Sequence, residues 1–128
     1  MKTEINEIEI NGVKYVPKDS VFSTAESLNG MPYVVCRFYS AGVFAGYLEK
    51  KTFEKGETPS VILRKARRLW RWYGAQECTE LARTGINNST DNKICGAIEK
   101  IEVFNCIEIS YATEAAQKTI EGAPVWKA

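Results

Sequence analysis

A dense group of cations and aromatic rings lies in the middle of the chain. Between Val61 and Tyr73, five of thirteen residues are Arg or Lys and none is acidic, although the formal net charge of the whole molecule is only +1. Guanidinium groups present a planar fork of donors that suits phosphate, and indole rings offer flat faces on which a purine can stack. The segment therefore predicts a nucleotide site, unless the cations form the solvated face of a strand whose tryptophans fill the core. The residues concerned are Arg64, Lys65, Arg67, Arg68, Trp70, Arg71 and Trp72.

A second stretch, residues 39–46, places small residues and a hydroxyl group close to Arg37. Its sequence is Tyr-Ser-Ala-Gly-Val-Phe-Ala-Gly, and a backbone of small residues can approach an anion closely. It does not match the phosphate-binding loop, because no Gly-Lys-Ser/Thr follows. It does not match the dinucleotide fingerprint either, because Gly42 and Gly46 are followed by neither a third glycine nor a helix. The alternative is that the two glycines only allow a tight hairpin or a β-bulge.

Several kinds of chemistry are disfavoured by what the chain lacks. It contains no histidine, which removes the usual general base and the commonest metal ligand. Glu77 and Glu80 would be neighbours on a helix, but no supporting group can be identified, so they are interpreted as a solvated face. We therefore expect no catalytic residue, no metal and no cofactor, and do not expect an enzyme.

The cysteine spacing does not predict a zinc site. The four cysteines are 42, 17 and 11 positions apart and include no Cys-x-x-Cys pair. Their apolar neighbours favour buried, reduced thiols, as in a cytosolic protein. The four are Cys36, Cys78, Cys95 and Cys106.

The first half of the chain predicts strands. Residues 8–16 alternate around Asn11-Gly12, which indicates a type I′ hairpin, and residues 18–32 form a polar connection. Residues 33–39 and 43–49 are β-branched and aromatic, as strands are. Residues 64–73 are interpreted as a further strand that places Trp70 and Trp72 on one face.

The second half adds two helices. Helical spacing between Gly74 and Gly85 predicts a short amphipathic helix. Residues 101–111 have the longest period-2 alternation and predict one central strand. Thr113 is expected to cap a final helix over residues 114–121.

These elements predict an α+β fold, an antiparallel β-sheet with two short helices, the second near the C-terminus. The length predicts a single domain over residues 1–128, with an N-terminal hairpin and linker in residues 1–31 and the core in residues 32–128. No apolar run approaches the ~18 residues of a membrane span. The N-terminus has no hydrophobic stretch of signal-peptide length, so we expect a cytoplasmic protein.

Three strings of residues indicate a family. Residues 32–47, from Pro32 to Tyr47, the segment Ala66–Trp72 and the closing Ala123–Trp126 resemble small phage-encoded proteins. Within that set, the chain is most similar to the Thoeris anti-defence sponges, over about residues 32 to 128.

The resemblance implies a specific function. Such sponges bind the immune signal glycocyclic ADP-ribose at sites between subunits, hold it without cleaving it and keep the effector switched off. Similar members assemble as dimers and hexamers, and some also hold cyclic oligonucleotides. Arg37, Arg67 and Arg68 would then meet phosphates, while Phe44, Trp70 or Trp72 would pack against the base. The complete set of candidate ligand residues is Arg37, Tyr39, Ser40, Gly42, Phe44, Arg67, Arg68, Trp70 and Trp72.

Two other functions use the same residues. A single-stranded nucleic-acid-binding module would use the arginines and tryptophans on a polymer, although the near-zero net charge argues against it. A phage structural or interaction domain would bury the aromatic segment and turn the arginines toward acidic partners. If the protein is a sponge, replacing Arg67 and Arg68 by Ala should weaken ligand capture far more than it lowers the melting temperature.

The C-terminal segment Pro124–Trp126 is apolar. It is expected either to cover a neighbouring subunit or to fold back on its own core.

Overall fold

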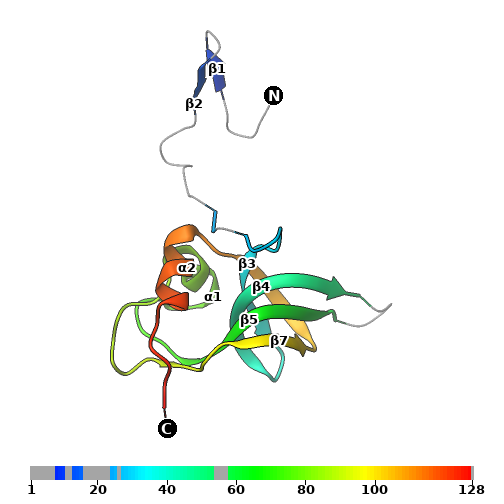
Figure 1. Cartoon of the computed structure of the whole chain (residues 1–128), viewed down its shortest axis with the longest axis vertical. Helices are drawn as coiled ribbons and strands as arrows, with labels where there is room; N and C mark the ends of the chain where they lie inside the picture. The colour runs from blue at the N-terminus through cyan, green and yellow to red at the C-terminus, as the bar shows by residue number, and fades with distance from the viewer. Residues whose placement is uncertain (1–7, 11–12, 16–23, 26, 54–57, 128) are drawn as a thin grey trace.

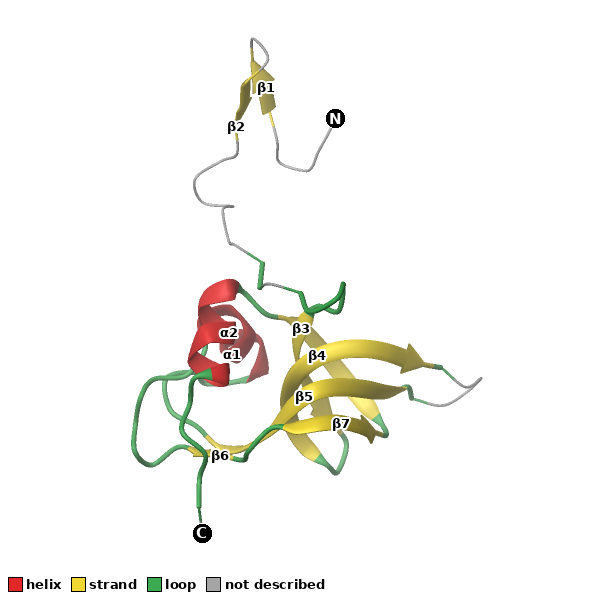
Figure 2. Cartoon of the chain, viewed as in Figure 1, coloured by secondary structure: helices red, strands yellow, loops and turns green. Residues whose placement is uncertain are grey.

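The computed structural model describes residues 8–10, 13–15, 24–25, 27–53 and 58–127 of the chain. They form an α+β fold in which two helices lie beside a strongly curved antiparallel sheet (Figure 1, Figure 2). The predicted fold class is therefore confirmed, including a second helix near the C-terminus. The elements are β1 (Ile8–Ile10), β2 (Val13–Tyr15), β3 (Tyr33–Phe38), β4 (Gly42–Thr52), β5 (Ser60–Arg71), α1 (Cys78–Thr84), β6 (Lys93–Ile94), β7 (Ile98–Val103), β8 (Cys106–Tyr111) and α2 (Glu114–Glu121).

The main sheet curls because its two edges are connected by a very short link. Its order is β6-β5-β4-β3-β8, and β7 pairs with the same edge of β5 as β6 does, farther toward the start of β5. Only Phe104 and Asn105 separate β7 at one edge from β8 at the other. Asn105 has a φ of 61°, a left-handed conformation that asparagine tolerates better than most residues. The edges must therefore approach each other at this point.

The prediction of one central strand over residues 101–111 is wrong. The segment contains the end of β7 and the whole of β8, which lie at opposite edges of the sheet. The alternation of apolar and polar residues is broken at Phe104, Asn105 and Cys106, where the apolar and polar types exchange places. The prediction of one strand overlooked this break.

Both faces of the central strands are buried. One core lies between the sheet and the helices and includes Val35, Ala45 and Leu69. The other lies inside the curl of the sheet and includes Phe44 and Leu63. Because successive side chains on a strand point to opposite faces, β3 and β4 contribute to both cores.

A bulge in β5 decides which face its later residues occupy. Lys65 has a φ of 50°, and the pairing with β4 shifts register there. One extra residue reverses the direction of every side chain that follows, so Leu69 joins the helix-side core whereas Leu63 lies inside the curl. Gly46 lies opposite the bulge, where a Cβ atom would lie 3.0 Å from the Ala66 Cα. Because of the bulge, Arg67 points to the helix side of the sheet and Arg68 to the inside of the curl, beside Phe44.

The two predicted helices are present with their predicted caps. The Thr113 side chain accepts a hydrogen bond from the Ala116 N–H at 3.1 Å. Gly85, with a φ of 80°, follows α1 and donates its N–H to the Leu81 carbonyl at 2.9 Å. The described helices are too short and too polar to cross a membrane.

The N-terminal hairpin is described in part, and the C-terminal segment is described up to residue 127. β1 and β2 pair in antiparallel fashion, which confirms the predicted hairpin, while its turn at residues 11–12 and most of the predicted linker lie outside the described residues. At the other end, the Trp126 N–H donates to the Ile94 carbonyl at 2.8 Å, and the Lys93 Nζ lies 5.1 Å from the Trp126 ring centroid. The C-terminal segment therefore folds back on its own sheet.

Candidate functional site

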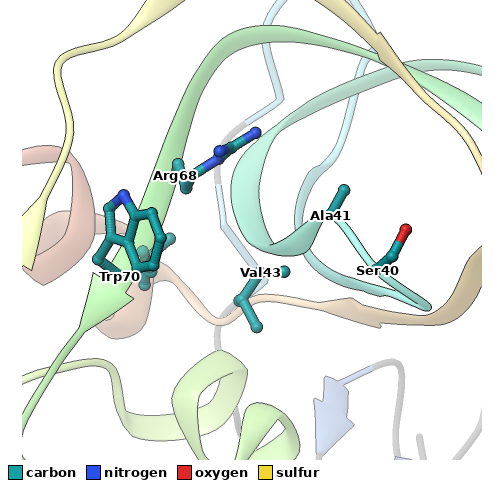
Figure 3. A pocket seen from close by; sticks show the side chains of 7 residues that line it. Ser40, Ala41, Val43, Arg68 and Trp70 are labelled. Carbon is teal, nitrogen blue, oxygen red and sulfur yellow. The ribbon is translucent and has the colours of Figure 1, made fainter.

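The turn between β3 and β4 faces the end of β5 across a shallow hollow of about 210 Å³ (Figure 3). Gly42 has a φ of 95°, which allows the chain to reverse tightly after Ala41. Figure 3 shows Ser40 and Ala41 on one side of the hollow, Trp70 on the other and Val43 between them. We call this hollow the turn pocket; it is lined by Ser40, Ala41, Gly42, Val43, Arg68, Leu69 and Trp70.

Arg68 supplies the positive charge of the turn pocket. Its guanidinium carbon lies 4.7 Å from the centroid of the Phe44 ring, and Phe44 is buried and packs edge-on against Phe38. In the described part of the chain, no carboxylate forms an ion pair with Arg68. Arg64, on the same strand, contacts Glu49 at 2.5 Å. The Arg68 guanidinium therefore packs on an aromatic ring, and no carboxylate of the described residues compensates its positive charge.

A second hollow, of about 420 Å³, lies beside the start of α1. It contains two further predicted residues, Arg37 and Trp72. The Arg37 Nε donates to Glu108 Oε1 at 3.2 Å, and the Trp72 Nε1 donates to the Ala75 carbonyl at 3.0 Å. We call this hollow the helix pocket; it is lined by Arg37, Val43, Trp72, Gln76, Glu77, Cys78, Thr79 and Glu108.

The two tryptophans do not share one face, contrary to prediction. Trp70 is exposed and lines the turn pocket. Trp72 packs against the helix-side core and lines the helix pocket. β5 ends at Arg71, so Trp72 no longer follows the alternation of the strand.

Arg67 lies outside both pockets. Its side chain is buried, and its pKa is lowered chiefly by desolvation. The guanidinium donates to backbone carbonyls, including Cys95 O at 2.8 Å, Ile120 O at 2.9 Å and Ala123 O at 2.7 Å. Carbonyls at the end of α2 carry partial negative charge, which suits a cation. The predicted phosphate contact therefore needs correction: Arg67 joins the C-terminal segment to β5.

A family model described as "Domain of unknown function (DUF6948)" matches residues 31–120. The chain belongs to this family. The matched region contains every residue that lines the turn and helix pockets. Neither the curated proteins nor the solved structures contain a match to the chain.

The DUF6948 domain brings together six of the nine predicted ligand residues, in two groups. Ser40, Gly42, Arg68 and Trp70 line the turn pocket, and Arg37 and Trp72 line the helix pocket. Phe44 does not line the turn pocket, but its ring packs against the Arg68 guanidinium. Tyr39 is 80 % exposed and lines neither pocket.

Val43 and Glu108 are two of the lining residues of the DUF6948 domain that were not predicted as ligand residues. Val43 lines both pockets, and its neighbours in the turn were the only signal for it. Glu108 is 71 positions from Arg37 in the chain, and only the pairing of β3 with β8 places the two opposite each other.

The cysteines of the DUF6948 domain are free thiols, and three of the four are buried. The Cys106 Sγ donates to the Glu108 carbonyl at 3.6 Å, and the neighbouring Cys106 thiol together with burial raises the pKa of Cys36. Within the described residues, no group of three or more His, Cys, Asp or Glu side chains could hold a metal ion.

Proposed function

We propose that this domain binds a cyclic nucleotide immune signal of the glycocyclic ADP-ribose type and sequesters it without cleaving it. It would thereby block activation of the effector in the cytoplasm of the host bacterium. The proposal is supported by the resemblance to Thoeris anti-defence sponges and by the turn pocket. The observation that carries it is the Arg68 guanidinium, which lies beside an exposed indole and has no carboxylate partner among the described residues.

The chemistry of the turn pocket suits storage of a phosphorylated ligand. A guanidinium can bind pyrophosphate oxygens with charge-assisted hydrogen bonds, and the Trp70 ring offers a flat apolar surface. Among the described residues that line this pocket, Arg68 is the one ionisable side chain. Ser40 therefore has no lining residue beside it that could remove its proton.

The energetics favour a site shared between subunits. Nanomolar capture requires about −12 kcal/mol, whereas each charge-assisted hydrogen bond contributes about 1.5–3 kcal/mol. That total corresponds to about four to eight such bonds, whereas the described lining of one turn pocket offers a single charged donor group, Arg68. We therefore include assembly into a homo-oligomer, a dimer or a hexamer, in the proposal.

A calorimetric titration with glycocyclic ADP-ribose tests this function. Wild-type protein should bind the ligand tightly, and Arg68→Ala should weaken binding at least about tenfold, the loss of one charge-assisted hydrogen bond. Arg71→Ala is the matched control, because Arg71 is exposed on the same strand and lines neither pocket; its affinity should stay within about twofold.

Two results would overturn the proposal. One is the absence of binding heat with the wild-type protein. The other is an equal loss of affinity in Arg68→Ala and Arg71→Ala, which would indicate non-specific attraction to the basic strand. Binding to single-stranded oligonucleotides alone would favour the nucleic-acid-binding alternative.

A further inference from the structure

The turn pocket and the helix pocket are neighbours that share one lining residue, Val43. Their volumes differ, at about 210 Å³ and about 420 Å³. Pockets that enclose small ligands span roughly 300–1,000 Å³. The turn pocket alone is therefore small for a nucleotide, while the helix pocket has room for a ring system.

The two pockets also differ in charge. The described residues that line the turn pocket include a cation and no acid, whereas Glu77 and Glu108 line the helix pocket. A carboxylate accepts hydrogen bonds and repels phosphate. The helix pocket therefore suits a part of the ligand that donates N–H groups.

Of the two carboxylates that line the helix pocket, Glu108 has an oxygen that can accept a further hydrogen bond from a ligand. Glu77 already accepts from the Glu80 N–H at 2.9 Å and from the Thr79 hydroxyl, and these bonds lower its pKa. Glu108 Oε1 accepts from Arg37, while within the described residues its Oε2 has no hydrogen bond. Arg37 thus fixes the direction of a carboxylate whose second oxygen is available.

Trp72 supplies the apolar surface of the helix pocket. Its indole N–H is engaged by the Ala75 carbonyl at 3.0 Å, so a ligand can contact this ring only through its carbon surface. Stacking is the interaction that such a ring offers to a flat heteroaromatic base.

We propose that the helix pocket binds the base of the ligand, an amino-purine that stacks on Trp72 and donates an amino N–H to Glu108. The phosphates then lie beyond Val43, on Arg68 in the turn pocket. This assignment rests on the proposed function and adds to it which end of the ligand each pocket recognises.

The three tryptophans of the chain allow the two pockets to be observed separately. Each indole N–H gives its own signal in an NMR spectrum of ¹⁵N-labelled protein. Inorganic pyrophosphate should shift the Trp70 signal alone, and glycocyclic ADP-ribose should shift both Trp70 and Trp72. Trp126 lines neither pocket, so its indole N–H signal should not shift with either probe.

A pair of variants tests the role of Glu108. Glu108→Ala should weaken glycocyclic ADP-ribose binding about tenfold, the loss of one hydrogen bond to a charged group, and should not weaken pyrophosphate binding. Glu99→Ala is the matched control, since Glu99 also lies on a strand and contacts an arginine, Arg64, at 3.6 Å. Its affinity for both probes should match that of the wild type.

The outcomes separate the two proposals. If the nucleotide binds with dependence on Arg68 but leaves Trp72 unshifted and tolerates Glu108→Ala, the base assignment is overturned and the proposed function stands. If neither probe shifts Trp70 and no binding is detected, the proposed function fails and the base assignment fails with it.

Discussion

Arg67 and Arg68 are adjacent in the sequence but serve different purposes, because successive side chains of a strand point to opposite faces. The bulge at Lys65 decides which face each of them takes. Arg67 is a buried cation that satisfies backbone carbonyls of the C-terminal segment. Arg68 remains accessible above Phe44. The expectation that both would affect ligand capture more than stability therefore applies to Arg68 alone.

Arg67→Ala should lower the free energy of unfolding by roughly 3–5 kcal/mol, because several buried carbonyls lose their donor at once. Arg68→Ala should lower it by less than about 1 kcal/mol, the contribution of an accessible cation–π contact. Urea unfolding of both variants measures the difference. Equal losses would contradict the roles assigned to the two side chains.

Tyr33 provides a test at alkaline pH. Its hydroxyl is buried without a hydrogen-bond partner among the described residues, and burial, with the nearby Glu121, raises its pKa above the ordinary value of 10.0. The unfolded chain therefore releases this proton first, so the free energy of unfolding should be fully retained below about pH 10 and fall as the pH rises further.

Tyr33→Phe should remove part of this alkaline loss. The variant deletes an unsatisfied hydroxyl and keeps the ring that packs against Tyr47 at 5.0 Å, so its stability at pH 7 should equal or slightly exceed that of the wild type. Denaturant unfolding at several pH values compares the two proteins. A large destabilisation at neutral pH would mean that the hydroxyl has a partner in solution.

Among the elements, β5 has the strongest influence on the site, and its bulge depends on Gly46. A Cβ atom at this position would lie 3.0 Å from both the Ala66 Cα and the Arg64 carbonyl oxygen. Backbone atoms cannot move aside as a flexible side chain can. The register that turns Arg67 toward the helices and Arg68 toward the inside of the curl therefore requires glycine at position 46.

Gly46→Ala should destabilise the domain by about 1–3 kcal/mol, the usual cost of overpacking, and should also weaken ligand binding, since Arg68 shifts with β5. Gly96→Ala is a suitable control because its Cβ would make an ordinary contact, 3.6 Å from Val125. Thermal unfolding and calorimetry of both variants test this. If Gly46→Ala behaved like the control, the bulge would not depend on the glycine.

Local signals predicted most of the elements. The caps at Thr113 and Gly85 and the strand character of residues 64–73 depend on neighbouring residues, and the structure agrees with them. The bulge at Lys65 was not predictable in this way, because it depends on the pairing of β5 with β4, which single-chain periodicity does not contain. The turn at Asn105 coincides with a break in the alternation at residues 104–106, which the prediction of one strand overlooked.

The residues of the site were also predictable only where their own residue types gave a signal. The residue types of Arg68 and Trp70 indicated phosphate and base recognition, and the structure brings these two side chains into one hollow. Arg67 has the same residue type, and only its burial distinguishes it. Glu108 had no sequence signal at all, because the contact with Arg37 is made across strands.

For the whole molecule, a near-neutral net charge with one accessible cation in the turn pocket predicts weak salt dependence. Raising the salt from 50 to 200 mM should weaken glycocyclic ADP-ribose binding by less than about tenfold. A polymer-binding protein with many phosphate contacts would lose about 10³–10⁵ in affinity over the same range. Titrations at both concentrations measure this slope, and a loss of the larger size would favour a nucleic-acid-binding module.

The central claim is capture without chemical change, and recovery of the ligand tests it most directly. Purified protein is incubated with glycocyclic ADP-ribose, washed, denatured and analysed by mass spectrometry for released small molecules. We expect intact ligand from the wild-type protein and strongly reduced recovery from Arg68→Ala. Recovery of a cleavage product, or of no ligand from the wild type, would contradict it.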